Sequence, residues 1–238
     1  MLRRPVFKLM AVLLLATATL GYVGERTSAA ADMEWHRVPT PLGTLNVALV
    51  RPLGEGNGDR HPVIVALPWG SGSAQLVESF VGSYWLTDPM LRGYYVVAPE
   101  VRGSTLVDTA DEIIPAIFEW MESELYFDEG QVALVGASNG GRGLFYAALS
   151  QPERFRALVG LPGQHTGDAE ELSVLEGTPI WLLVGELDAP WVAGTESTAS
   201  ALEAAGIPSR VDVLPGQGHV LRLDPNELLD WIDNALDR

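Results

Sequence analysis

Continuous apolar runs alternate with segments of helical periodicity along most of the 238-residue chain. Apolar runs of this length are typical of strands buried on both faces of a sheet, and they occur at 62–67, 94–98, 131–135, 157–161, 179–184 and 211–214. Apolar residues at spacings of three and four predict helices at 74–86, 113–121, 139–150, 191–205 and 225–236. An earlier run at 45–50 is typical of an antiparallel strand. The alternation predicts a three-layer α/β fold, with helices on both faces of a mostly parallel sheet.

The first 31 residues have the parts of a secretory signal peptide. A basic head with Arg3, Arg4 and Lys8 precedes an apolar run, and small residues then lead to a cleavage site after Ala31. An uncleaved membrane anchor is the alternative, but polar residues interrupt the run, which is short for a span of about 20 residues. The paired arginines leave both the general secretory route and the twin-arginine route open.

Cleavage would leave residues 32–238 as one catalytic domain, secreted into the periplasm or the medium. The chain has no Cys, which excludes disulfides, thiolate catalysis and thiolate metal sites. The net charge is −16, and residues 32–238 hold 11 Arg, no Lys and 30 acidic residues, a balance of −19. This charge repels nucleic acid and anionic membranes, so we expect neither a nucleic-acid partner nor stable membrane association after cleavage. The sequence does not indicate an oligomeric state.

Gly136-Ala137-Ser138-Asn139-Gly140 matches the G-x-S-x-G pattern. The motif follows a predicted strand directly and opens a predicted helix, which is the context of a nucleophile elbow. Its small residues suit a tight turn in which larger side chains would clash. A Gly-rich turn of a nucleotide-binding fold is the alternative, but the G-x-G-x-x-G pattern is missing. Ser138 is therefore the candidate nucleophile.

A nucleophilic serine needs a histidine base and an acid that orients the histidine. Asp188 lies just beyond the predicted strand at 179–184, and His219 lies just beyond the strand that ends at Leu214. Both positions are at the carboxyl ends of strands, where open α/β sheets bind their ligands. Asp188 and His219 are the candidate acid and base.

Other residues compete for these roles. Glu186 lies nearer the strand end, Asp168 is a further acid, and Asp188 itself could instead cap the following helix. The remaining histidines either precede the core strands or follow the strand before the acid, and they are His36, His61 and His165. Their places suit a base less well than that of His219.

Together these features resemble the α/β-hydrolase superfamily over residues 63–236, and especially its small secreted serine esterases of the dienelactone-hydrolase-like and carboxylesterase-like kinds. The order serine, acid, histidine along the chain is the one found in that superfamily. Dienelactone hydrolases proper use a Cys nucleophile, so their specific activity is not implied here. The resemblance implies cleavage of carboxylic esters through an acyl-enzyme, with no metal and no organic cofactor.

The resemblance also implies an oxyanion hole with two backbone donors. The first is the N–H of Asn139, after the nucleophile, and the second comes from the loop after Leu67. Relatives often begin this loop with His-Gly, whereas this chain has Leu67-Pro68, which makes Trp69 the expected second donor. Pro68 has no N–H, and its fixed φ stiffens the loop.

The segment between the predicted strands at 157–161 and 179–184 is too short for a large cap domain. We therefore expect an open cleft, edged by Trp69 and Trp191, with Tyr146 and His165 as further candidate lining residues. The expected partner is a small-molecule or polymeric ester substrate. The same triad also serves peptidases and amidases, and a non-catalytic exported binding protein on this fold is a third hypothesis.

Overall fold

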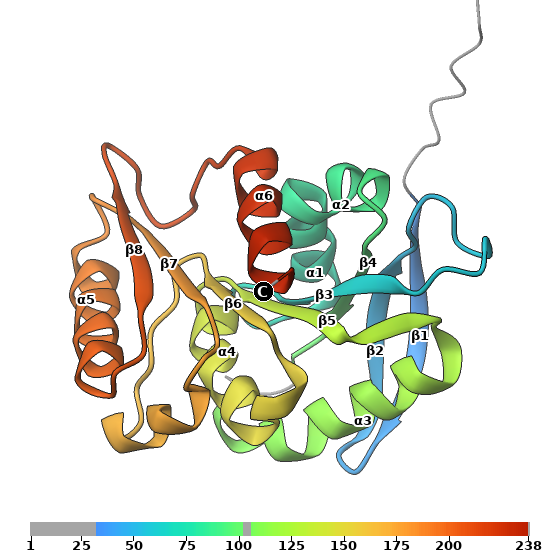
Figure 1. The fold of residues 1–238 in the computed structure, drawn as a ribbon, viewed down its shortest axis with the longest axis horizontal. Coiled ribbons are helices and arrows are strands. Elements are labelled where there is room, and N and C mark those ends of the chain that lie inside the picture. Colours follow the sequence, from blue (N-terminus) through green and yellow to red (C-terminus); the bar gives the residue numbers. More distant parts are fainter. Residues whose placement is uncertain (1–31, 102–105, 238) are drawn as a thin grey trace, which may run out of the picture.

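The structure, a computed structural model, describes residues 32–101 and 106–237, so the predicted signal peptide lies outside the described residues. The described residues form an eight-stranded sheet with the order β1-β2-β4-β3-β5-β6-β7-β8 (Figure 1). The strands are β1 (Met33–Thr40), β2 (Gly43–Val50), β3 (His61–Leu67), β4 (Tyr95–Pro99), β5 (Phe127–Gly136), β6 (Ala157–Gly160), β7 (Ile180–Gly185) and β8 (Ser209–Leu214). Strands β3 to β8 run parallel, and β1 and β2 are antiparallel to their neighbours.

Helices cover both faces of this sheet (Figure 1). They are α1 (Ala74–Phe80), α2 (Thr87–Leu91), α3 (Ala110–Glu124), α4 (Asn139–Ser150), α5 (Ala189–Ala204) and α6 (Pro225–Leu236). Buried residues of α3, α4 and α5 pack on one face, and those of α1, α2 and α6 pack on the other. The predicted three-layer architecture with a mostly parallel sheet is confirmed. None of the helices in the described ranges is both long enough and apolar enough to cross a membrane.

Two elements differ from the prediction. Strand β1 was not expected, because it lies at the edge of the sheet and buries only Val38 fully, so its sequence shows no apolar run. The single helix predicted over 74–86 is wrong: α1 ends at Phe80 and a π-helical turn, Val81–Trp85, follows before α2. Tyr84 and Trp85 are both buried in this wider turn, and periodicity alone does not reveal such a local change of pitch.

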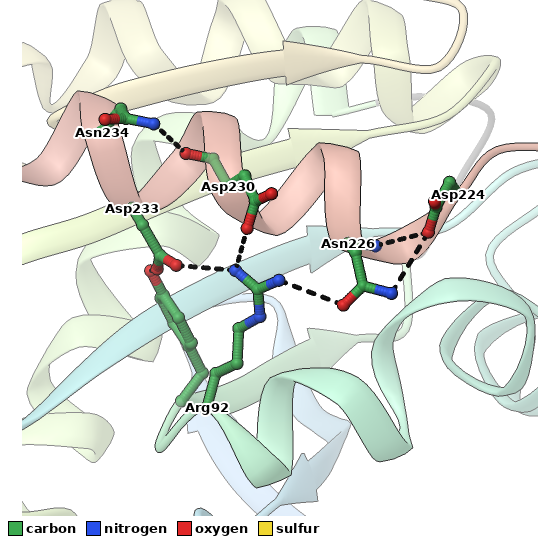
Figure 2. Close-up of polar contacts among 7 residues, drawn as sticks. Arg92, Asp224, Asn226, Asp230, Asp233 and Asn234 are labelled. Atoms are coloured by element: carbon green, nitrogen blue, oxygen red, sulfur yellow. Dashed lines mark hydrogen bonds and ion pairs between the residues drawn. The ribbon is translucent and has the colours of Figure 1, made fainter.

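Arg92, at the end of α2, ties this helix to α6. Its guanidinium group donates to Asp230 at 2.6 Å, to Asp233 at 2.8 Å and to the Asn226 side-chain oxygen at 3.1 Å (Figure 2). The three acceptors lie along one side of α6, so the fork of donors fixes the helix in position as well as binding its charges. The last helix, which follows the predicted histidine loop, is thereby held against its neighbours.

Three buried tyrosines lead to a pH-dependence prediction. Burial raises the pKa of the Tyr84, Tyr94 and Tyr95 hydroxyls above 10.0, and the pKa of Tyr95 reaches about 12. For Tyr94 and Tyr95 a hydrogen bond to a carboxylate adds to the shift. The hydroxyls donate to the Leu221 carbonyl, Asp233 and Glu55, respectively. Above pH 10 the unfolded chain loses these protons while the folded chain keeps them, so folding stability falls as the pH rises.

We therefore expect the temperature of the thermal unfolding midpoint to stay constant as the pH rises to about 10, and to fall at higher pH. Calorimetry at pH steps from 8 to 11.5, with tyrosinate absorbance recorded in parallel, measures this. Tyr94→Phe removes one of the three titrating groups and should make the decline shallower. A midpoint that does not change between pH 9.5 and 11.5 would contradict the assignment.

Candidate active site

Ser138 lies in a sharp turn between β5 and α4. Its φ of 57° and ψ of −114° are strained for a residue with a side chain. A Cβ at Gly136 would lie 2.2 Å from the Gly140 carbonyl oxygen, and one at Gly140 would lie 2.1 Å from the Leu67 oxygen. At Gly141 a Cβ would lie 1.9 Å from the Pro162 oxygen. The glycines around Ser138 are therefore required by close backbone approach, as expected for a nucleophile elbow.

The three candidate catalytic residues meet at the carboxyl ends of β5, β7 and β8. The Nε2 atom of His219 lies 2.8 Å from the Ser138 hydroxyl oxygen, and its Nδ1 atom lies 2.5 Å from Oδ2 of Asp188. A carboxylate at Nδ1 holds the proton there, which leaves Nε2 free to accept the serine proton. The Asp188 side chain is 14% exposed and that of His219 is 42% exposed, so the acid is sheltered while the base is open to solvent.

Asp188 occupies the N-cap position of α5, but its side chain makes no capping bond and turns to His219 instead. Glu186, the rival acid, accepts a hydrogen bond from the Gly216 N–H at 2.8 Å. The N–H of Leu187 donates to the Gln217 carbonyl at 2.9 Å in the same region. Glu186 therefore holds together the two loops that carry Asp188 and His219. Asp168, the other rival, precedes the 3₁₀ segment Ala169–Leu175 and contacts His165 through its carbonyl.

The loop after β3 lies beside the elbow. The Ala137 N–H donates to the Leu67 carbonyl at 3.1 Å, and the Asn139 side chain donates to the Gly70 carbonyl at 2.7 Å. Within the described ranges, the backbone N–H groups of Trp69 and Asn139 donate no hydrogen bond to protein acceptors. Both predicted oxyanion donors are thus available near Ser138, and their role stays a prediction.

The residues predicted to line the cleft fall into two groups. The Trp191 ring centre is 5.4 Å from that of His219, which places this indole against the triad. Tyr146 lies two turns along α4 from Ser138, about 12 Å along the helix axis. Tyr146 instead contacts His165, at 5.9 Å between ring centres, and donates to or accepts from Thr166 at 3.0 Å. The structure brings Tyr146 and His165 together, and among the described residues their side-chain contacts are with each other and their neighbours, so their role in a cleft stays a prediction.

Sequence reasoning missed two residues that support the site. Tyr84, in the π-helical turn, donates from its hydroxyl to the Leu221 carbonyl at 2.5 Å, two residues beyond His219, and its ring also packs against Trp69 at 6.2 Å. Arg142 lies 4.6 Å from the Trp191 ring centre and donates to the Asn139 side chain at 3.1 Å. The i, i+3 spacing of Asn139 and Arg142 on a predicted helix was a usable signal, whereas the partner of Tyr84 is 137 residues away.

Comparison with known proteins bears on the fold of the chain. No family model matches the chain. Dipeptidyl-peptidase 5 of Porphyromonas gingivalis is 22% identical over 89% of this chain but only 39% of its own length. A thermostable esterase superposes with a TM-score of 0.71 at 18% identity, over 85% of this chain and 63% of that one. A ferulic acid esterase of the anaerobic fungus Anaeromyces mucronatus gives a TM-score of 0.71 at 13% identity, over 89% and 93%.

The chain has the α/β-hydrolase fold. Ser138 after β5, Asp188 after β7 and His219 after β8 follow the order along the chain that hydrolases of this fold use. Between β6 and β7 the described residues hold only the short 3₁₀ segment Ala169–Leu175. This α/β-hydrolase fold therefore carries no large cap domain at that position, as the sequence predicted.

Proposed function

We propose that the chain is a serine hydrolase that cleaves carboxylic esters through Ser138, His219 and Asp188. The hydrogen-bonded series from Asp188 to His219 to Ser138, on a strained elbow, is the observation that carries the proposal. Three side chains from distant parts of the sequence have no structural need to align in this way. The alignment equally argues against the hypothesis of a non-catalytic binding protein.

In the proposed reaction, Nε2 of His219 takes the Ser138 proton as the hydroxyl oxygen attacks the ester carbonyl. Asp188 stabilises the imidazolium that forms, and backbone N–H groups bind the oxyanion. His219 then gives its proton to the departing alcohol, leaving an acyl-enzyme. A water molecule activated by His219 releases the acid and restores Ser138.

Two features support an ester of an uncharged, partly apolar compound. Leu187 and Val220 are 70% and 63% exposed, and each is the chain neighbour of a triad residue. The triad histidine is also open to solvent, which suits a bulky or polymeric substrate. The match to a ferulic acid esterase over 93% of its length further supports ester chemistry.

Peptide or amide hydrolysis is the second candidate, and the similarity to a dipeptidyl-peptidase favours it. The chain spans about two fifths of that relative's length. The similarity therefore carries no information about substrate selection by the rest of the relative. The triad itself can cleave either bond.

The test compares the 4-nitrophenyl ester and the 4-nitroanilide of the same acyl group, with each rate divided by its rate without enzyme. We expect the ester to give the larger enzymatic kcat/KM, for both acetyl and feruloyl groups. If dipeptidyl anilides give the larger normalised value, the peptidase candidate replaces the esterase proposal. If the folded protein hydrolyses none of these compounds, both candidates fail.

A further inference from the structure

The Asn139 side chain connects the nucleophile elbow to the loop after β3. Its Nδ2 atom donates to the Gly70 carbonyl at 2.7 Å, across 69 residues of sequence. A second contact between the same segments is the bond from the Ala137 N–H to the Leu67 carbonyl, at 3.1 Å. Trp69 lies between these two tethered carbonyls. The Leu67 tether is made by backbone alone, whereas the Gly70 tether depends on one side chain.

Arg142 determines which way the Asn139 amide points. Its guanidinium group donates to Oδ1 of Asn139 at 3.1 Å, while the Gly70 carbonyl can only accept. A guanidinium has no acceptor and a carbonyl has no donor, so only one orientation of the amide satisfies both neighbours. Arg142 is itself held by the Trp191 ring and by its backbone bond to the Ser138 carbonyl at 3.0 Å. The amide is therefore fixed from both sides.

This arrangement matters for the proposed oxyanion hole. Its two donors, the N–H groups of Asn139 and Trp69, come from different segments. Both have to lie within hydrogen-bond distance of the same oxygen atom. Gly70 has a φ of +65° and the loop contains further glycine, so the backbone of this loop has much conformational freedom to lose. A donor that is preorganised stabilises the transition state without a cost at the moment of reaction.

We infer that the Asn139 side chain is a positioning residue that holds the Trp69 N–H in place for the oxyanion. The inference rests on the proposed function. It assigns the side chain of the residue after the nucleophile a role separate from that of its own backbone N–H. Replacing the side chain removes the tether and leaves both backbone donors present.

The test variant is Asn139→Leu, which is close in shape to asparagine but cannot donate or accept. We expect kcat for the 4-nitrophenyl ester to fall about tenfold to a hundredfold, which is less than the loss of a whole donor, with KM changed less than twofold. Affinity for a trifluoromethyl ketone, whose adduct with Ser138 carries an oxyanion, should fall by the same factor as kcat. Asn139→Gln, which restores a donor on a longer arm, should recover part of the loss.

Asn46→Leu is the matched control, because Asn46 makes a comparable side-chain bond, to Glu100 at 2.8 Å, outside the triad. Its kcat should equal that of the unaltered protein. If Asn139→Leu keeps full kcat, or loses kcat while the ketone binds as tightly as before, the inference is overturned. If the unaltered protein neither turns over esters nor binds the ketone, the proposed function has failed instead.

Discussion

Ser138→Ala is expected to abolish ester turnover, with kcat lowered by a factor of about 10⁶, and to leave the fold unchanged. The hydroxyl oxygen is the only atom removed, and it is the atom that lies 2.8 Å from Nε2 of His219. Without it there is no acyl-enzyme, and the remaining activity comes from the oxyanion hole and substrate binding alone. Ester hydrolysis, together with labelling by a fluorophosphonate probe and mass spectrometry of the labelled peptide, measures the effect.

Ser200→Ala is the control for this variant, since Ser200 is an exposed residue of α5 whose hydroxyl, within the described part of the chain, donates to the Glu196 carbonyl. It should label and turn over like the unaltered protein. Circular dichroism and the thermal midpoint should be the same for all three proteins. A Ser138→Ala protein that still hydrolyses esters, or still takes up the probe elsewhere, would reject Ser138 as the nucleophile.

The sheet could be predicted from sequence because its central strands are apolar on both faces. Val63, Ile64 and Val65 of β3 are each at most 1% exposed. The sequence of such a strand is a continuous apolar run, which is easy to recognise. Strand β1 could not be predicted in this way because, among the described strands, it pairs with β2 alone and most of its residues are exposed or half-buried. The π-helical turn after α1 was not predictable for another reason: a change of helical pitch depends on what Tyr84 and Trp85 pack against.

The place of the candidate site could be predicted because the carboxyl ends of parallel strands lie along one edge of the sheet. Its supporting contacts could not. The choice between Asp188 and Glu186 depends on how two loops meet, and a Cβ at Gly185 would lie only 2.2 Å from the Gly218 carbonyl oxygen. This close approach sets which carboxylate reaches His219. Spacing along the chain gives both acids nearly the same place.

The cleft role predicted for Tyr146 and His165 depends on how far each residue lies from the triad. Tyr146 lies within α4, two turns along the helix from Ser138, and His165, in the loop after β6, packs against Phe145 and Tyr146. Trp191 differs because it lies in the first turn of α5, three residues after Asp188, and its ring packs against that of His219. For residues on a helix, such as Tyr146 and Trp191, the number of helical turns from the strand end decides how near they lie to the triad.

Asp188→Asn is expected to lower kcat by a factor of about 10⁴ with little change in KM. An asparagine can present its amide N–H to Nδ1 of His219, which then has to be the unprotonated nitrogen. The proton moves to Nε2, and that atom can no longer accept the proton of Ser138. The geometry of the triad is retained, so the thermal midpoint should change little. Steady-state kinetics with the 4-nitrophenyl ester provides the measurement.

Glu186→Gln is the matched variant, because it also exchanges a carboxylate for an amide on the same loop. A glutamine oxygen still accepts from the Gly216 N–H, so the loop that leads to His219 keeps its support. We expect kcat within about threefold of the unaltered protein, a loss of under 1 kcal/mol of transition-state stabilisation. If Glu186→Gln proves the more damaging change, Glu186 is the acid that orients His219. The hydrogen bond between Asp188 and His219 would then be present in the free protein but not used in the reaction.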